Sequence, residues 1–152
     1  MSEYLQTVFD KFELRVRKGY YYTEDGIWAN LEGTRVRLGV SDYTQRTGGD
    51  AAFVELVREG TAVERQAEIG TLETSKTTVS LHSPISGTME QTNATLLNKP
   101  ELVNSDPYGD GWLAILLPSN LEDDLKALMS ADGYFRLMLR NLETEHKKLE
   151  SK

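Results

Sequence analysis

The N-terminal segment carries hydrophobic side chains at helical spacing. Tyr4, Val8 and Phe12 are four residues apart, so they would form one stripe along a helix. Leu5 and Phe9 lie beside this stripe, so the segment is expected to pack on the body of the protein, with docking to a partner as the alternative. This pattern predicts a short amphipathic helix over residues 2–13, within an N-terminal helical extension that covers residues 1–18.

From Tyr20 onward the spacing becomes that of β-strands. Residues 34–40 show it most clearly, because Val36, Leu38 and Val40 alternate with two arginines and therefore lie on one face of an extended chain. Short segments of this kind recur at roughly 8- to 12-residue intervals with turns between them, which favours a β-sandwich or barrel over βαβ units. The segments expected to be strands are residues 20–23, 27–31, 34–40, 51–56, 69–73, 77–81, 85–89 and 112–117.

Helices are expected within and after this β-rich region. Ser41 starts a short helix that ends at paired glycines. Beyond Asn120 the apolar residues return to helical spacing. The stripe of the C-terminal helix is expected to consist of Phe135, Leu139 and Leu142, with Tyr134 and Met138 alongside. The expected helices are residues 41–47, 121–129 and 131–148, the last with an end that frays. The predicted organisation is an extension, a β domain, and a C-terminal helix with a frayed tail, at residues 1–18, 19–130 and 131–152.

Composition and charge narrow the class of protein. The chain has 152 residues, of which 39% are hydrophobic, and this suits one folded domain. Its net charge of −7 argues against a nucleic-acid-binding protein, which needs a basic face. No apolar run reaches the roughly 18 residues of a membrane span, and the acidic N-terminus lacks the features of a signal peptide. We therefore expect a cytoplasmic protein that binds neither nucleic acid nor membrane.

One lysine stands out because strands are predicted on both sides of it. Lys76 lies between residues 69–73 and 77–81, so it falls at or near the tip of a tight hairpin. A long side chain at such a tip extends away from the body of the protein, where a large enzyme can reach it. A lysine in a turn is most often only a solvated charge, but acylation would replace that charge with a long neutral tether. We therefore predict that Lys76 is the attachment point of a swinging-arm cofactor.

Few residues are suited to catalysis or metal binding. The chain has no cysteine, and its two histidines, His82 and His146, are far apart in the sequence. No nucleophile–base pair or phosphate-binding loop is recognisable, so we expect no metal site, no catalytic residues and no stand-alone enzyme. Trp28 and Trp112 are expected in the core. The sequence Asp-Pro-Tyr-Gly at residues 106–109 predicts a turn with a structural role.

Several motifs together resemble one family. The sequence Glu-Thr-Ser-Lys at residues 73–76, followed by Ser-Pro-Ile-Ser-Gly at residues 83–87, is similar to the lipoylation segment of the glycine cleavage system H protein. Residues 38–45 and 49–56 resemble the segments that precede this hairpin in the family. The most specific match is Pro-Glu-Leu-Val-Asn-Ser-Asp-Pro-Tyr-Gly-Asp-Gly-Trp at residues 100–112. The motifs occur in the expected order over most of the chain.

The resemblance implies a mainly β fold of the barrel-sandwich hybrid type, with flanking helices and a C-terminal helical segment. It also implies a lipoyl carrier without activity of its own, with lipoate in amide linkage to Lys76. In the family, a pyridoxal-phosphate glycine decarboxylase loads an aminomethyl group onto the arm and a tetrahydrofolate-dependent aminomethyltransferase receives it. The flavoenzyme dihydrolipoamide dehydrogenase then reoxidises the dithiol. A lipoate ligase or lipoyltransferase attaches the cofactor, and Glu73 either helps it recognise the hairpin or is only a strand-end charge.

The chain departs from the family pattern in three places. Gly-Ile-Trp stands at residues 26–28 where the family usually has His-Glu-Trp, so Gly26 is either a turn residue or the mark of a widened pocket. Residues 77–80 lack the usual acidic residue, and residues 1–18 are longer than the family needs. These differences leave open an H-protein-like lipoate-binding protein of a heterodisulfide-reductase-like sulfur-oxidation complex, or a non-lipoylated H-like interaction module. Biotin is less suited than lipoate, because biotinyl lysines are typically flanked by methionines.

Overall fold

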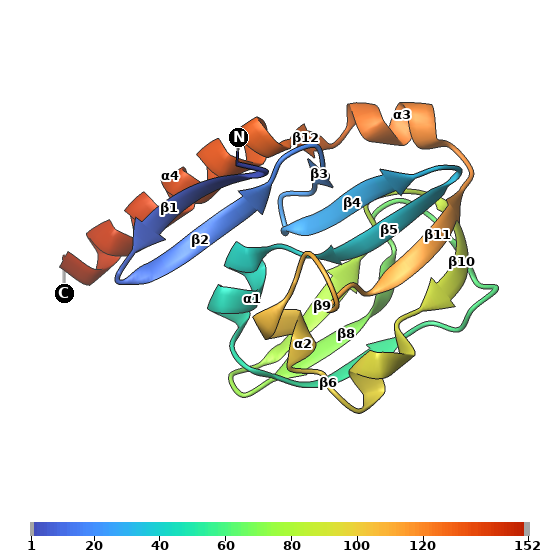
Figure 1. Ribbon diagram of the computed structural model, residues 1–152, viewed down its shortest axis with the longest axis horizontal. Helices are drawn as coiled ribbons and strands as arrows, with labels where there is room; N and C mark the ends of the chain where they lie inside the picture. Colours follow the sequence, from blue (N-terminus) through green and yellow to red (C-terminus); the bar gives the residue numbers. More distant parts are fainter. Residues whose placement is uncertain (1, 151–152) are drawn as a thin grey trace.

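The computed structural model describes the backbone of residues 2–150 and the side chains of residues 2–146. It confirms a mainly β fold with flanking helices (Figure 1). The strands are β1 (Tyr4–Phe9), β2 (Phe12–Arg17), β3 (Tyr21–Tyr22), β4 (Ile27–Glu32), β5 (Arg35–Val40), β6 (Ala51–Leu56), β7 (Ala62–Val63), β8 (Glu68–Thr74), β9 (Thr78–His82), β10 (Gly87–Thr92), β11 (Ala114–Pro118) and β12 (Met129–Ser130). The α-helices are α1 (Asp42–Gly48), α2 (Leu102–Ser105), α3 (Leu121–Lys126) and α4 (Ala131–Glu150), and a 3-10 helix, η1, spans Ala94–Leu97.

The strands of the described residues pair in three antiparallel sheets. The largest sheet has seven strands in the order β12-β3-β4-β5-β11-β10-β7, and a second sheet has three strands in the order β6-β8-β9. In Figure 1 these two sheets face each other as layers, which is the sandwich arrangement predicted from the strand spacing. The third sheet is the N-terminal hairpin of β1 and β2.

The first hydrophobic core lies between the two larger sheets. Val36, Leu38 and Val40 of β5 are fully buried, as their alternation predicts. The three-stranded sheet contributes Leu72 of β8 and Leu81 of β9 to the same core. Removing such apolar surface from water stabilises the fold by roughly 25 cal/mol per Å², so this interface holds the two layers together.

The predicted N-terminal helix is wrong, because residues 4–17 form the β1-β2 hairpin instead. Asp10 and Lys11 turn the chain with positive φ angles of 46° and 72°. Two consecutive residues with positive φ are the geometry of a type I′ turn, whose twist matches that of paired strands. The hairpin lies along α4 and outside the two facing sheets (Figure 1).

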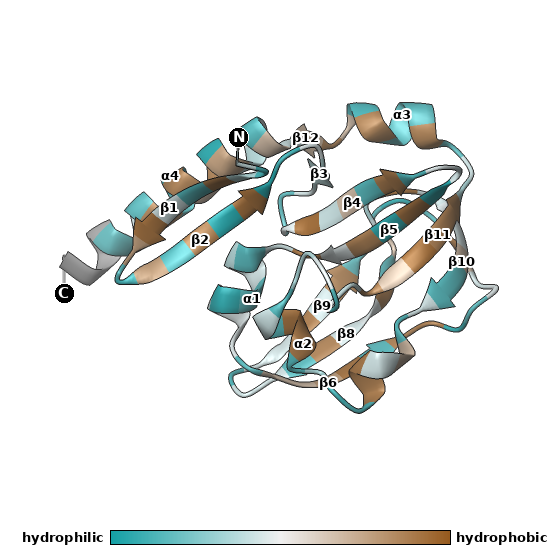
Figure 2. Ribbon diagram, in the orientation of Figure 1, coloured by the Kyte–Doolittle hydropathy of each residue, from teal (hydrophilic) through white to brown (hydrophobic). Residues whose placement is uncertain are grey.

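The helical prediction failed because its spacing was ambiguous. Tyr4 and Val8 are four residues apart, and four is also a multiple of the two-residue period of a strand. Val8 is 70% exposed, so the supposed stripe is not a buried face. The informative alternation comes later, in β2, where Leu14 and Val16 are buried between charged residues. Figure 2 shows hydrophobic and hydrophilic positions alternating along this strand.

A second core joins the hairpin and α4 to the outer face of the seven-stranded sheet. Trp28 lies in β4 between Ile27 and Ala29, and all three side chains are buried. Successive strand residues point to opposite faces, so Trp28 enters the second core while its neighbours enter the first. The buried members of the second core are Leu14, Val16, Tyr22, Trp28, Ala131, Tyr134, Met138 and Leu142.

The C-terminal helix presents a slightly different face from the one predicted. Leu142 is buried as expected, but Tyr134 and Met138 complete the buried face. Leu139, which was assigned to the stripe, is 38% exposed. The helix spans Ala131–Glu150, and the fraying expected after residue 142 stays a prediction.

The other helices largely follow the prediction. Helix α1 begins after Ser41, whose hydroxyl accepts a hydrogen bond from the Thr44 N–H at 3.1 Å, and it ends at Gly49 with φ 97°. Helix α3 ends at Lys126 and is shorter than predicted. Met129 lies instead in the edge strand β12, where it pairs with Tyr22 of β3. Within the described residues, no helix is both long and apolar enough to cross a membrane.

Gly39→Ala tests the packing of the second core. Gly39 is the cross-strand neighbour of Trp28, and a Cβ there would lie 2.3 Å from Cζ2 of the fully buried indole. We expect this variant to lose about 1–3 kcal/mol of unfolding free energy, measured by urea denaturation. Gly48→Ala is the control, because nothing lies within 4 Å of the added atom. If both variants were as stable as the parent, the described packing around Trp28 would be incorrect.

Candidate functional site

The predicted lysine lies at the tip of the β8-β9 hairpin. The hydroxyl of Thr74 organises the turn, since it donates a hydrogen bond to the Thr77 carbonyl at 3.0 Å. The same oxygen accepts hydrogen bonds from the backbone N–H groups of Lys76 and Thr77, both at 3.1 Å. The Thr74 N–H also donates to the Thr77 carbonyl, at 2.8 Å. The tip is therefore a closed turn that satisfies its own backbone groups and leaves the Lys76 side chain exposed.

A second set of hydrogen bonds fixes the tip to the neighbouring loop. The Ser75 N–H donates to the Asp50 carbonyl at 2.9 Å. Asn104 fixes that loop in turn, because its amide donates to the Gly49 carbonyl at 3.0 Å and accepts from the Ala51 N–H at 2.8 Å. Asn104 belongs to the motif at residues 100–112. Through Asn104, this motif fixes the loop to which the hairpin tip is hydrogen bonded.

The side chain of Lys76 lies against the backbone at the end of α1. A Cβ on Gly49 would be 3.1 Å from Cγ and 3.2 Å from Cδ of Lys76, so a larger residue would press on the lysine. Gly49 also has a positive φ of 97°, which few other residues adopt. Within the described residues, no carboxylate forms an ion pair with the Lys76 amine. The exposed amine is therefore suited to acylation.

The remaining candidates from the sequence lie on separate elements. Glu73 is exposed near the end of β8, where Thr78 is its partner in β9. His82 lies in β9 with its Nδ1 3.9 Å from an oxygen of Asp25, whereas His146 lies in α4. In the part of the chain that the structure describes, no group of three or more potential ligands is suited to a metal ion.

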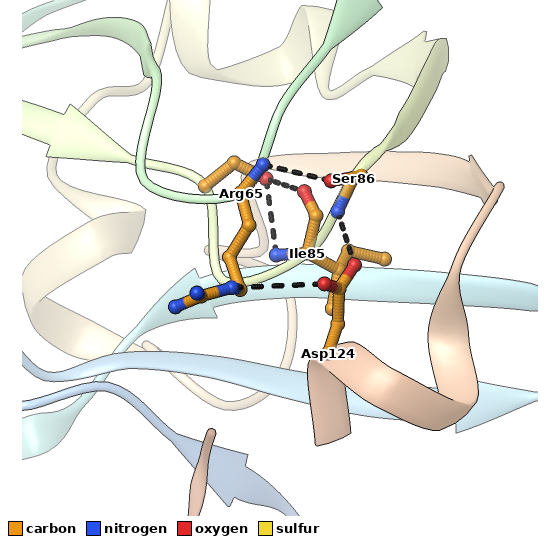
Figure 3. Close-up of polar contacts among 5 residues, drawn as sticks. Arg65, Ile85, Ser86 and Asp124 are labelled. Atoms are coloured by element: carbon orange, nitrogen blue, oxygen red, sulfur yellow. Dashed lines mark hydrogen bonds and ion pairs between the residues drawn. The ribbon is translucent and has the colours of Figure 1, made fainter. Parts of the chain in front are cut away.

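The turn that follows β9 is fixed from two sides (Figure 3). The Ser86 N–H donates to Oδ2 of buried Asp124 at 2.7 Å, and the Arg65 N–H donates to Oγ of Ser86 at 2.9 Å. The Arg65 guanidinium forms an ion pair with the other Asp124 oxygen at 3.6 Å. Within the turn, the Ser83 hydroxyl donates to the Ile85 carbonyl at 2.7 Å. Helix α3 thus fixes the path by which the chain returns from the lysine hairpin to the core.

The turn at residues 106–109 is structural, as predicted. Its first carbonyl accepts a hydrogen bond from the N–H of its last residue, and the Pro107 carbonyl accepts one from the indole N–H of Trp28 at 3.0 Å. Trp28 is fully buried, which confirms the prediction for this residue. Trp112 is only half-buried: it packs against the second core, and the guanidinium of Arg37 lies 4.8 Å from the centroid of its ring.

Gly26 is a turn residue and does not mark a widened pocket. Its φ is 81°, and a Cβ there would lie 1.9 Å from Oγ1 of Thr44 and 2.7 Å from the Tyr134 hydroxyl. The Tyr134 and Ser41 hydroxyls are themselves hydrogen bonded at 2.7 Å. Side chains from α1 and α4 therefore fill the space beside Gly26.

These features define a class of protein. A two-layer β domain presents an exposed lysine on a fixed hairpin tip, and the described residues show no metal cluster. Carrier domains have this arrangement, and in them a modified lysine is offered to the active sites of other proteins.

Comparison with known proteins identifies the kind of carrier. The family described as Glycine cleavage H-protein matches residues 20–141. The chain is 42% identical over 123 residues to a probable glycine cleavage system H protein of Thermococcus kodakarensis, covering 80% of this chain and 91% of the relative. It is 39% identical over 119 residues to the glycine cleavage system H protein of Thermus thermophilus, covering 78% and 92%. The chain therefore belongs to the glycine cleavage H-protein family.

A solved structure of the same family supports the fold. The crystal structure of a glycine cleavage system H protein from Mycobacterium marinum superposes with a TM-score of 0.71 at 29% identity, covering 78% of this chain and 95% of that chain. This likeness confirms the barrel-sandwich fold. Members of the family are lipoyl carriers, not enzymes, and they hold lipoate covalently on a lysine. The β1-β2 hairpin precedes the residues that the family match covers.

Sequence reasoning missed the residues that position the lysine. Thr74 was read only as part of a motif, although a threonine at a predicted turn often bonds to nearby backbone groups. Asn104 and Asp124 were missed because each acts on a segment far away in the sequence. Only the specificity of the motif at residues 100–112 gave a signal for Asn104.

Asp124→Ala tests the anchor of the turn after β9. The substitution leaves the Ser86 N–H without its acceptor, so we expect a loss of about 1–3 kcal/mol of unfolding free energy in urea. The matched control is Asp123→Ala in the same helix, because the Asp123 side chain is 69% exposed and pairs with the exposed Lys126. This control should change stability by no more than about 0.5 kcal/mol. Equal effects of the two substitutions would show that Asp124 anchors nothing.

Proposed function

We propose that Lys76 is the lipoylated residue of this carrier, and that the chain shuttles a covalently bound intermediate of glycine cleavage between partner enzymes. The observation that carries this proposal is the exposed Lys76 side chain on a hydrogen-bonded hairpin tip, inside the region that matches the family. Lipoate supplies a disulfide that opens by exchange or reduction and closes on oxidation.

The described residues fit this role through positioning. Thr74 and Asp50 hold the tip in place, so the start of the tether is fixed while its far end is free to move. Acylation also removes the positive charge of the amine, which leaves a neutral tether. A tethered group reaches each partner at a high effective concentration.

The partners follow from the family. We propose a pyridoxal-phosphate glycine decarboxylase, an aminomethyltransferase and dihydrolipoamide dehydrogenase, together with a lipoate ligase or lipoyltransferase. The relatives reported above are all glycine cleavage system H proteins by name. No observation favours the sulfur-oxidation carrier or the non-lipoylated module, so neither alternative is proposed. A cytoplasmic location stays a prediction.

Lys76→Arg tests both the attachment site and the shuttle. Protein from a lipoylation-competent host should gain the mass of one lipoyl group, and the variant should gain none. With a cognate decarboxylase, the lipoylated parent should support exchange of the glycine carboxyl carbon with bicarbonate, whereas the variant should not. Lys99→Arg is the control and should behave like the parent. Lipoate on the Lys76→Arg protein would refute the assignment, and a lipoylated parent without exchange would refute the glycine cleavage role alone.

Glu73→Gln tests whether the exposed carboxylate helps a lipoylating enzyme to recognise the hairpin. A charge-assisted hydrogen bond is worth about 1.5–3 kcal/mol, so its loss should slow lipoylation by roughly tenfold or more. The rate is measured by intact mass against time with purified ligase. Glu68→Gln, at the far end of the same strand, should leave the rate unchanged. Equal rates for both variants would mean that Glu73 is only a strand-end charge.

A further inference from the structure

The two edges of the β1-β2 hairpin differ in how their backbone groups are satisfied. At the outer edge of β2, the Arg15 N–H donates to Oδ2 of Asp42 at 2.9 Å, and the Arg15 carbonyl accepts from the Tyr108 hydroxyl at 2.9 Å. The Arg17 carbonyl accepts a hydrogen bond from the Tyr22 hydroxyl at 2.7 Å. The outer edge of β2 is therefore closed by side chains from the body of the protein.

The outer edge of β1 faces away from every described strand, because β1 pairs only with β2 among them. The Lys18 N–H donates to the Glu3 carbonyl at 2.8 Å, and hydrogen-bonded pairs alternate along antiparallel strands. The odd-numbered residues of β1 therefore bond to β2, and the even-numbered residues direct their N–H and C=O groups away from it. Arg15 confirms this alternation, since it lies opposite Gln6 and its own backbone groups point away from β1.

Two residues leave the outer edge of β1 open. The outward groups of Tyr4 are satisfied, because its N–H donates to the Ser2 hydroxyl oxygen at 3.1 Å and that hydroxyl donates to its carbonyl at 3.0 Å. Among the described residues, nothing pairs with the outward N–H and C=O groups of Gln6 and Val8. Both side chains are exposed, that of Val8 to 70%. We call these two residues the open edge.

The sequence of β1 favours pairing at the open edge. Tyr-Leu-Gln-Thr-Val-Phe contains no charged residue, no proline and no glycine, and most of its residues prefer strands. Proteins commonly protect an exposed edge strand with a lysine, a proline or a β-bulge. Strand β1 has none of these, and its register with β2 is regular. The open edge is therefore suited to the addition of another strand.

Helix α4 adds apolar surface on the same side. The ring of Phe9 in β1 contacts that of His146 in an edge-to-face arrangement, with 6.5 Å between the centroids. Leu139 precedes His146 by seven residues, which is two helical turns, so both lie on the side of α4 that faces β1. Leu139 is 38% exposed. A strand added to β1 thus meets an exposed apolar side chain as well as free backbone groups.

From these observations we propose that the open edge pairs with β1 of a second copy of this chain. The two hairpins then form one antiparallel four-stranded sheet about a two-fold axis. One register satisfies all the outward groups, and it places Gln6 of each copy opposite Val8 of the other. Pairing Gln6 with its own counterpart would set Val8 against Tyr4, whose groups are already bonded to Ser2. The two-fold axis therefore passes beside Thr7.

The charges that flank β1 favour a second copy as the occupant. In this register Glu3 of each copy lies level with Lys11 of the other, and Leu5 lies opposite Phe9. Opposite charges across a strand pair are stabilising and like charges are destabilising, so an uncharged strand with these flanks complements itself. The interface is small, so the association is weak and depends on concentration. Neither Lys76 nor its modification takes part, and the pairing is independent of the proposed lipoylation.

Two measurements on the unmodified full chain test the pairing. In sedimentation velocity, the mass should rise from one chain to two between roughly 1 μM and 1 mM, the range of weak complexes. Over the same range, the amides of Gln6 and Val8 should gain protection from hydrogen exchange, whereas that of Thr7, which bonds to β2, should be protected throughout. A chain that stays monomeric, even one whose open edge captures a strand of another protein, overturns the proposal.

Charged variants test the interface itself. Gln6→Lys combined with Val8→Lys places lysines opposite lysines, and it should raise the dimer Kd by about tenfold or more. Glu13→Lys is the matched control, because it changes the charge equally on the exposed face of β2 and should leave the Kd unchanged. A dimer that forms equally well in the double variant and the control overturns the pairing through β1.

A mixing experiment tests the register. Gln6→Glu combined with Val8→Glu should also be monomeric alone, but mixed with the double lysine variant it should form a one-to-one dimer, because lysines then lie opposite glutamates. A mixture that stays monomeric overturns the register. Should the double variants fail to fold, amide protection in the parent decides: a dimer without protection at Gln6 and Val8 overturns the proposal.

Discussion

The structure depends on a constraint at one turn: a lysine must be exposed while the backbone that carries it stays fixed. A hairpin tip normally exposes unpaired backbone groups and moves easily. Here the Thr74 hydroxyl bonds to three backbone groups of the turn, and the Asp50 carbonyl takes the N–H of Ser75. The turn is therefore closed by its own hydrogen bonds and joined by one more to the neighbouring loop at Asp50, while the lysine side chain takes no part in these bonds.

This constraint explains why the motif at residues 100–112 and helix α3 contribute to the same site. Asn104 fixes the loop below the tip, and Asp124 fixes the turn through which β9 leaves it. Neither residue contacts the lysine amine. Each satisfies buried or half-buried backbone groups that would otherwise cost about 1–3 kcal/mol when left unpaired. Their contribution to a carrier is rigidity at the base of the tether, not chemistry at its end.

The sequence was sufficient to predict structural elements where their pattern was local and unambiguous. It was insufficient where the structure depends on contacts between distant segments. Alternation in β5 and the cap at Ser41 gave the correct elements, and the motif around Lys76 gave a correct hairpin. The N-terminal helix failed because four-residue spacing fits both helix and strand, and because the turn at Asp10 lacks the usual glycine. The sequence did not predict the second core. Trp28 is buried there together with residues of β2 and α4, and these two segments are more than a hundred residues apart in the chain.

The second core also explains how the N-terminal hairpin is attached to the carrier domain. A hairpin of two strands is at best marginally stable alone, so it needs a surface to pack on. Trp28 on the sheet and Met138 on α4 contribute to that surface, and Leu14 of the hairpin belongs to the same core. The same packing places the turn end of the hairpin beside α1. Gly49, at the C-terminal end of that helix, lies against the side chain of Lys76. Because residues at the turn end of the hairpin and Lys76 line the same cavity, the extension forms part of the surroundings of the tether.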